Sequence, residues 1–241
     1  MMRRFAPLFL IAVLLAGPAA SDAAGRRMLG DAEAVAFSAV GRVNIAGSRF
    51  CTGTLIEPRL VLTAAHCLFN PRTGRPVALS TIRFVAGLRL GRYAAVRNVS
   101  RVALPSDYDV LREDRSRLLG SDVALLELDA PVPMDDAKPF AVGRPLAGAE
   151  PYAVVSYARD RAHAPSIERR CPRRGVRGPI AALGCEVTYG ASGAPVIAEA
   201  SDGARIAAIV SAMGRDRSGG PVALTVNVAP KLAELKAQLG L

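Results

Sequence analysis

The chain has 241 residues and a net charge of +10, with 51% hydrophobic and 22% charged residues. This length allows one large all-β domain or two smaller lobes with a sizeable core, and the composition excludes a disordered chain. The basic residues are mostly arginines scattered along the sequence, and no aromatic residues interleave with them. A nucleic-acid-binding function is therefore not expected.

The first segment has the pattern of an export signal. A basic head at Met1–Arg4 precedes an apolar run at Phe5–Ala16 and small residues at Gly17–Ala24. Sec-type signal peptides have this order. We therefore expect residues 1–24 to be removed and the mature protein to be secreted or periplasmic. No later segment of the sequence has the length and apolar character of a membrane span, so no membrane attachment is expected after cleavage.

The rest of the chain has the pattern of short β-strands separated by turns. The candidate strands are rich in Val, Ile and Leu and are mostly bounded by Gly, Pro, Asp or Ser. They cover residues 39–46, 53–56, 60–63, 81–86, 94–103, 123–128, 152–157, 194–198, 206–212 and 222–228. Four prolines between Asp129 and Gly148 indicate a linker between two lobes, and helical spacing behind Pro230 predicts a helix over Lys231–Leu239. Many short strands without long alternating helices indicate an all-β barrel or sandwich.

The chain has four cysteines, Cys51, Cys67, Cys171 and Cys185. An even number in an exported chain suggests two disulfides, and four cysteines allow three pairings. Pairing of neighbours along the chain is the simplest of the three. A zinc site needs tighter cysteine spacing or more histidines than this chain offers, so we expect no metal.

Three stretches carry residue types suited to nucleophilic catalysis. In the first, two strands joined by a turn deliver His66 beside a cysteine. In the second, Asp122 opens an apolar strand, and in the third, Ser192 lies in a Gly-rich turn. Each feature alone is commonly structural, but their order along the chain is one of those compatible with a Ser-His-Asp triad. A serine hydroxyl needs an adjacent base to act as a nucleophile at neutral pH, so we predict that His66 activates Ser192.

These stretches resemble the motifs of trypsin-like serine peptidases. Residues 51–56 and 61–67, CTGTLI and VLTAAHC, resemble the histidine motif of that family. Residues 121–132, SDVALLELDAPV, resemble the aspartate motif, and residues 190–195, GASGAP, resemble the serine motif. The resemblance runs from about Met28 to the C-terminal helix. Its details favour the bacterial, glutamyl-endopeptidase-like branch, in which a cysteine also lies seven residues before the serine.

The resemblance implies two six-stranded antiparallel β-barrels with a C-terminal helix and a site in the cleft between them. The first lobe, residues 25–132, would carry His66 and Asp122, and the second, residues 133–241, would carry Ser192. The backbone amides of Gly190 and Ser192 would form the oxyanion hole.

The same resemblance implies a serine endopeptidase that acts on polypeptides as a monomer, through an acyl-enzyme intermediate and without a cofactor. A Cys51–Cys67 disulfide would hold the histidine loop. A Cys171–Cys185 disulfide would hold the approach to the serine loop.

The serine motif departs from that of animal trypsins. Ala191 stands where those enzymes carry an aspartate that pairs with a new amino terminus during activation, so that switch is not expected here. Residues 26–30, RRMLG, nevertheless resemble a propeptide junction. Cleavage after Arg27 is one hypothesis, and an unstructured mature N-terminus is the other.

The substrate-binding residues are expected on both sides of the serine motif. Glu186, with Val187 beside it, stands where trypsin has the acid that reads Arg or Lys, which suggests a basic residue before the scissile bond. The glutamate-reading histidine of true glutamyl endopeptidases should fall near Val210 and is absent, so glutamate specificity is not favoured. The segment Ser211-Ala212-Met213 matches the substrate-pairing strand of the family, and Met213 would narrow the pocket.

Two other functions stay open. A catalytically silent homologue would act as an extracytoplasmic binding module, and its only support is the altered serine motif. An esterase is chemically allowed because the same triad cleaves esters. The α/β-hydrolase route to an esterase is not supported, since in that fold the histidine comes last along the chain.

Overall fold

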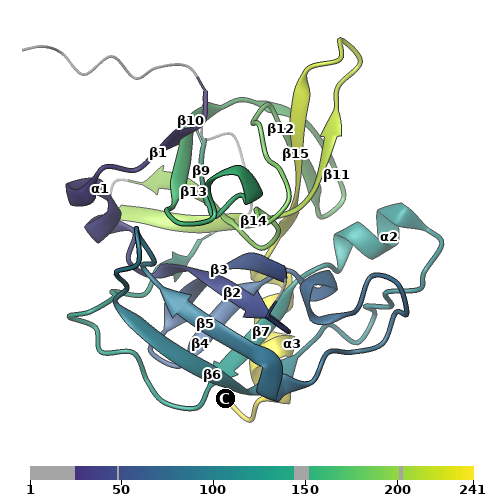
Figure 1. Cartoon of the computed structure of the whole chain (residues 1–241). Coiled ribbons are helices and arrows are strands. Elements are labelled where there is room, and N and C mark those ends of the chain that lie inside the picture. The colour runs from purple at the N-terminus through teal and green to yellow at the C-terminus, as the bar shows by residue number, and fades with distance from the viewer. Residues whose placement is uncertain (1–24, 48, 144–151, 201–202) are drawn as a thin grey trace, which may run out of the picture.

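The computed structural model describes residues 25–47, 49–143, 152–200 and 203–241. The expected signal peptide, residues 1–24, and residues 144–148 of the Pro-rich linker lie outside the described residues. Within the described part, most regular structure is β-strand, arranged in two stacked β units (Figure 1). None of the helices described is long and apolar enough to cross a bilayer.

The first unit is a closed barrel of six antiparallel strands. Its order is β2-β3-β4-β7-β6-β5, and pairing of β5 with β2 closes it. Strands β4 and β7 are buried along their whole length and lie side by side, with Leu62 opposite Leu125. The strands are β2 (Val40–Ile45), β3 (Arg49–Glu57), β4 (Leu60–Thr63), β5 (Ile82–Ala86), β6 (Ala95–Ala103) and β7 (Ala124–Leu128).

The second unit is a nine-stranded sheet. Its main path is β1-β10-β9-β13-β14-β15-β12-β11, and β8 pairs with β14. The Cys171–Cys185 disulfide joins the end of β10, near one end of this path, to the segment after β12, near its other end. The strands are β1 (Arg27–Met28), β8 (Ala141–Val142), β9 (Tyr152–Ser156), β10 (Ser166–Cys171), β11 (Arg173–Arg177), β12 (Ile180–Leu183), β13 (Pro195–Ala200), β14 (Gly203–Arg215) and β15 (Pro221–Asn227).

Short helices connect these strands. The α-helices are α1 (Asp31–Ala36), α2 (Arg115–Gly120) and α3 (Ala229–Gln238), and the 3-10 helices are η1 (Ala65–Leu68), η2 (Leu79–Thr81) and η3 (Arg159–Arg161). Helix α2 begins at an N-cap, Asp114, whose carboxylate accepts from the N–H groups of Ser116 and Arg117. Helix α3 has a proline in its first turn, where the missing N–H costs nothing.

Strand β1 packs on the second sheet and helix α3 packs on the first barrel, the reverse of their order along the chain. Strand β1 belongs to the first lobe expected from the sequence, but it pairs with β10 of the second sheet. Helix α3 follows the second sheet, yet its buried Leu235 belongs to the core of the first barrel, and α3 lies beside that barrel in Figure 1. The division of the chain into two lobes near residue 132 stays a prediction. The first described strand and the last helix each pack on the lobe to which the prediction does not assign them.

The predicted all-β fold is confirmed, and so is the C-terminal helix, which begins two residues before the predicted start. All ten candidate strands coincide with observed ones, within a few residues at their ends. The sequence pattern missed β1, β8, β10, β11 and β12 as well as α1 and α2. Both neighbour disulfides, Cys51–Cys67 and Cys171–Cys185, are present.

Candidate active site

His66 and Asp122 are brought together by the first barrel. Strand β4 leads into η1, which holds His66, and Asp122 lies between α2 and β7. Because β4 and β7 are neighbours in the barrel, the two residues meet at one end of that pair. Asp122 Oδ2 lies 2.7 Å from His66 Nδ1, and Asp122 Oδ1 accepts from the backbone N–H of His66 at 2.8 Å. Two bonds from one carboxylate fix both the ring and the backbone of the histidine.

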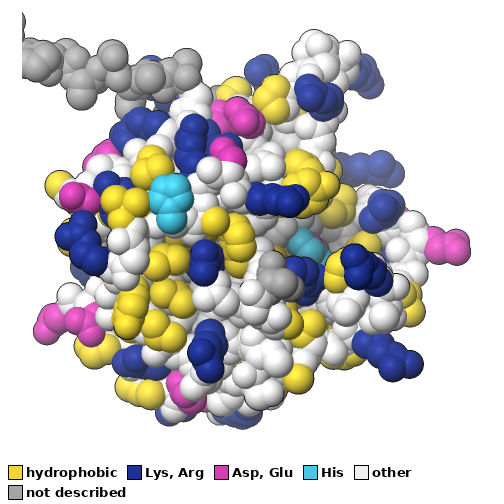
Figure 2. Space-filling view, in the orientation of Figure 1, with side chains coloured by type: hydrophobic (Ala, Val, Ile, Leu, Met, Phe, Trp, Pro, Cys, Tyr) yellow, Lys and Arg dark blue, Asp and Glu magenta, His cyan; other side chains and the backbone are white. Residues whose placement is uncertain are grey.

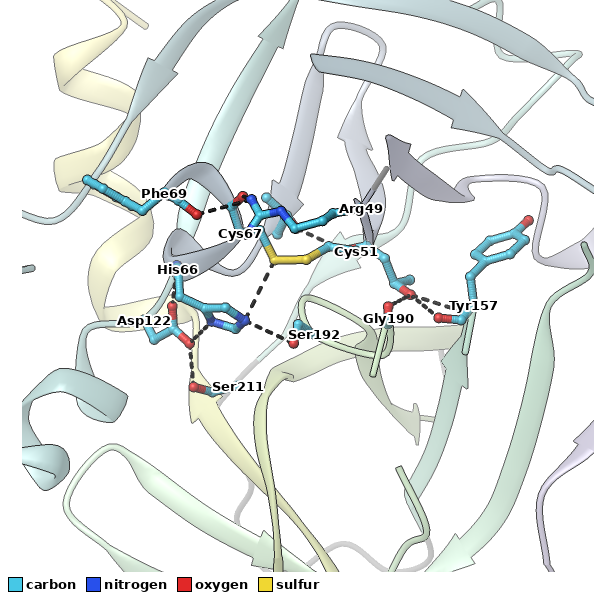
Figure 3. Close-up of a disulfide and its surroundings, with 12 residues drawn as sticks. Arg49, Cys51, His66, Cys67, Phe69, Asp122, Tyr157, Gly190, Ser192 and Ser211 are labelled. Atoms are coloured by element: carbon cyan, nitrogen blue, oxygen red, sulfur yellow. Dashed lines mark hydrogen bonds and ion pairs between the residues drawn. A yellow bond between two sulfur atoms is a disulfide. The ribbon is translucent and has the colours of Figure 1, made fainter. Parts of the chain in front are cut away.

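Ser192 completes the arrangement from the turn that leads into β13 of the second sheet. Its Oγ lies 3.0 Å from His66 Nε2 (Figure 3). A carboxylate can only accept, so Nδ1 of His66 carries the proton that it donates to Asp122. This tautomer leaves the Nε2 lone pair free to accept from the Ser192 hydroxyl, which is the geometry that a general base requires.

The electrostatics of His66 follow from its partners. Burial by itself lowers the pKa of His66, but the charge of Asp122 and the hydrogen bond to it outweigh burial. The pKa of His66 therefore lies above its ordinary value. Asp122 is buried, with its side chain 3% exposed, while the His66 side chain is 39% exposed and can meet a ligand from solvent.

Ser211 is a further partner of Asp122. Its hydroxyl donates to Asp122 Oδ2, and the residue is buried. The register of β14 against β15 shifts between Val210 and Ala212, so Ser211 is the extra residue of a bulge. Bulges re-aim side chains next to functional sites, and this bulge lies where Ser211 reaches the carboxylate. The sequence predicted Ser211 for substrate binding and gave no signal for this contact.

Thr52 connects the two units at the serine loop and was missed by the sequence analysis. Its backbone N–H donates to the carbonyl of Ser192 at 2.9 Å. Its hydroxyl donates to the carbonyl of Gly190 at 2.9 Å and accepts from the N–H of Tyr157 at 3.0 Å. Thr52 is fully buried in β3. A polar residue beside Cys51 in a buried strand was the signal that could have found it.

Two glycines shape the serine loop. Gly190 has φ +93° and Gly193 has φ +79°, a region that side chains with a Cβ rarely adopt. At Gly193 an added Cβ would meet the backbone of Thr52 and Ala64, and at Gly190 it would meet Phe50. The N–H groups of Gly190 and Ser192 donate to no described residue, so both are free to donate to a ligand.

The Cys51–Cys67 disulfide fixes the loop that carries His66 (Figure 3). Arg49 adds to it, because its guanidinium donates to the carbonyls of Cys67 and Phe69 at 3.1 and 3.0 Å. The four cysteines lie near His66 or Glu168 in two clusters of metal-ligand type. Since all four are in disulfides, they offer no thiolate to a metal.

A cleft of about 860 Å³ lies over these residues. Most of the substrate-binding residues expected from the sequence line it: Val187, Val210, Ser211, Ala212 and Met213. Its lining also contains three arginines that the sequence did not single out, Arg49, Arg115 and Arg159. No Asp or Glu belongs to the lining in the part of the chain described.

Glu186 is absent from the lining of this cleft, and its expected role in substrate binding stays a prediction. Its side chain is 60% exposed and its carboxylate lies 3.7 Å from the guanidinium of Arg26. Its backbone N–H donates to the Glu168 carboxylate at 2.8 Å. These contacts direct the segment after Cys185 so that Val187, and not Glu186, reaches the cleft wall.

The expected propeptide junction is part of the folded protein. The Arg26 guanidinium donates to both carboxylate oxygens of Asp160, at 3.0 and 2.7 Å. The bond after Arg27 lies inside β1, and Leu29 is buried. Cleavage after Arg27 stays a hypothesis, and it would require β1 to open locally from β10.

Comparison with known proteins agrees with this geometry. The family model described as Trypsin matches residues 30–233, most of the chain. The chain belongs to the trypsin family. A solved structure of a Glu endopeptidase in complex with MPD matches with a TM-score of 0.73 and 15% identity, covering 90% of this chain and 98% of that one. At this identity the match shows the trypsin-family fold alone.

The trypsin-family relatives are distant in sequence. Trypsin Blo t 3 of Blomia tropicalis is 28% identical over 186 residues, which is 73% of this chain and 64% of that protein. A modular serine protease of Drosophila melanogaster is 32% identical over 87 residues, 34% of this chain and 13% of that protein. The chain therefore spans less than two thirds of the length of either relative.

Proposed function

We propose that this chain is a serine endopeptidase in which Ser192 is the nucleophile, His66 the general base and Asp122 the residue that orients the histidine. The observation that carries the proposal is the unbroken line of hydrogen bonds from Asp122 through His66 to Ser192. Membership of a family of serine peptidases supports it.

The proposed reaction passes through an acyl-enzyme. The Ser192 Oγ attacks the peptide carbonyl while His66 Nε2 takes its proton, which then goes to the leaving amine. A water molecule, activated by the same histidine, hydrolyses the ester. Asp122 stabilises the imidazolium that forms in each half-reaction. None of these steps uses a metal or a cofactor.

The oxyanion of each tetrahedral intermediate would be bound by the backbone N–H groups of Gly190 and Ser192. The positive φ of Gly190 and the two free N–H groups support this role. Loss of one such donor typically costs about 10²–10³ in turnover. Thr52 is a positioning residue here, because it holds the carbonyls of Gly190 and Ser192.

The substrate would lie along β14, with the backbone of Ser211, Ala212 and Met213 pairing to it. Its chemical class is polypeptide. We further propose that the mature chain acts as a monomer in the periplasm or outside the cell, where its two disulfides are stable.

Ala191 is compatible with activity. It is buried, and its N–H donates to the carbonyl of Thr188 at 3.0 Å, so the loop closes through its own backbone without a carboxylate. No contact in the described residues favours the silent binding module over the enzyme.

The test is hydrolysis of a randomised peptide library by the purified mature chain, beside Ser192→Ala. The proposal predicts cleavage within peptides, at a rate at least about 10³-fold above the Ser192→Ala control. Equal, background rates for the two proteins on the whole library would contradict it. Hydrolysis of simple esters but of no peptide would favour the esterase.

A further inference from the structure

A second cavity also borders α2, whose first residue lines the cleft. It has a volume of about 630 Å³ and is bordered by α2, by the turn between β11 and β12 and by the start of α3. We call it the basic groove and define it by its lining residues Asp107, Arg112, Arg117, Arg177, Asn227 and Lys231.

The charge of the basic groove is unbalanced. Four of its defining side chains are cations and one, Asp107, is an acid. Lys231 pairs with Asp107 at 2.8 Å. Arg177 is exposed and forms no ion pair with any described residue. A terminal nitrogen of Arg112 donates to the backbone carbonyl of Asp107. The buried Nε of Arg112 has no hydrogen-bond partner in the described part of the chain.

Arg117 adds a weakly held cation. It lies 3.5 Å from Asp114, and the two side chains are 76% and 52% exposed. An exposed pair of this kind contributes little and exchanges readily with a ligand. Arg112, Arg117 and Arg177 are therefore the guanidinium groups that the groove offers to an anion. Arginine suits carboxylates because its planar fork donates two parallel hydrogen bonds.

Helix α2 joins the basic groove to the cleft. Its first residue, Arg115, lines the cleft, whereas Ser116, Arg117 and Gly120 line the groove. The helix has six residues, so it is about 9 Å long. Figure 2 shows basic side chains around the histidine at the right of the molecule and beyond it toward the right edge.

We propose that the basic groove binds an acidic segment of the polypeptide whose scissile bond lies in the cleft. This inference rests on the proposed function, since the substrate is a polypeptide only if the chain is a peptidase. The cleft lining contains three arginines and, among the described residues, no acid. The positive surface of the groove therefore continues toward Ser192. Acidic residues on the substrate would then raise affinity and encounter rate, and salt would weaken both.

The test compares two peptides with the same cleaved sequence, taken from the library. One is short. The other carries a tail of eight glutamates, joined by a ten-residue Gly/Ser linker that spans up to about 33 Å. Two versions are made, one with the tail at the N-terminus and one with it at the C-terminus. The mature chain is compared with Arg117→Glu, with Arg117→Glu/Arg177→Glu and with Arg83→Glu. The last is the control for Arg117→Glu, because it makes the same change of charge at an exposed arginine of β5 that lines neither cavity.

We expect the acidic tail to raise kcat/KM about tenfold at low salt, mainly through KM, as for two or three exposed ion pairs acting together. The ratio between tailed and short peptides should fall in Arg117→Glu, reach about one in the double variant and stay near ten in Arg83→Glu. A ratio of one in the unaltered protein, or an equal loss in Arg117→Glu and Arg83→Glu, would overturn the inference.

Binding of fluorescein-labelled octaglutamate to the Ser192→Ala chain separates this inference from the proposed function. Binding that depends on Arg117 and Arg177, without hydrolysis of any peptide by the unaltered chain, would support the groove and overturn the peptidase. Binding of heparin but not of octaglutamate would overturn the acidic peptide in favour of a sulfated polysaccharide.

Discussion

The backbone N–H of Thr52 in the first barrel donates to the carbonyl of Ser192, in the turn that leads into β13 of the second sheet, at 2.9 Å. The same residue holds Gly190 through its hydroxyl. The position of the serine relative to His66 therefore depends on one buried residue of β3, and not only on the packing of two units.

Replacing Thr52 with valine should lower both stability and turnover. The change leaves the carbonyl of Gly190 and the N–H of Tyr157 without their buried partner, which costs about 1–3 kcal/mol. Urea unfolding and peptide hydrolysis measure the two effects. Thr54→Val is the matched control, because Thr54 is equally buried on the same strand and its hydroxyl has no described partner. We expect Thr54→Val to be neutral or stabilising, and equal losses in the two variants would refute this role of Thr52.

Gly193→Ala should destabilise the protein more than Gly219→Ala. Both glycines have positive φ, +79° and +84°, so both variants incur the backbone cost of about 1–2 kcal/mol. Only at Gly193 would the new Cβ meet backbone atoms, those of Thr52 and Ala64, whereas nothing lies within 4 Å at Gly219. The comparison uses thermal unfolding, and a melting temperature for Gly193→Ala equal to that of Gly219→Ala would contradict the close packing of the serine loop.

Strands β4 and β7, which the sequence predicted, are buried and mostly apolar, whereas β11, which it missed, is mostly exposed and basic. Strands such as β4 and β7 have continuous apolar runs, which a short buried strand requires. Strand β11 was missed because it reads Arg-Arg-Gly-Val-Arg and is nearly all exposed, so its place depends on pairing with β12 and not on an apolar face.

The candidate site divides in the same way. The proposed triad residues lie in local motifs, so the sequence pattern was sufficient to single them out. The contact between Ser211 and Asp122 joins residues 89 positions apart through a bulge, and no local pattern encodes it. Glu186 was placed by counting back from the serine, but its contact with Arg26, which is distant in sequence, lies outside the cleft.

The dependence of activity on pH should report the pKa of His66. The base must be neutral to accept the proton of Ser192, so kcat/KM should rise with pH through that pKa. Because Asp122 raises the pKa, the inflection should lie above the ordinary value of about 6.5. In Asp122→Asn the charge is lost while burial still lowers the pKa, so the inflection should move to lower pH and kcat should fall about 10⁴-fold. An inflection at the same pH in both proteins would show that Asp122 does not act on the histidine.

Glu186→Gln should leave the residue preference before the scissile bond unchanged. Glu186 does not line the cleft, and the charged residues that do, among those described, are Arg49, Arg115 and Arg159. We therefore expect peptide profiling to show no selection for Arg or Lys in either protein. A preference for basic residues that disappears in Glu186→Gln would place the carboxylate in the pocket and contradict the contact with Arg26.

The central claim is that Ser192 is a nucleophile activated by His66, and reaction with a fluorophosphonate probe tests it most directly. The mature chain is labelled before and after limited proteolysis near Arg27 and read by mass spectrometry, beside Ser192→Ala and His66→Ala. We expect one adduct, located on Ser192, absent from Ser192→Ala and formed much more slowly in His66→Ala. Absence of any adduct on folded protein in both preparations would contradict the claim, and the chain would then be a silent member of its family.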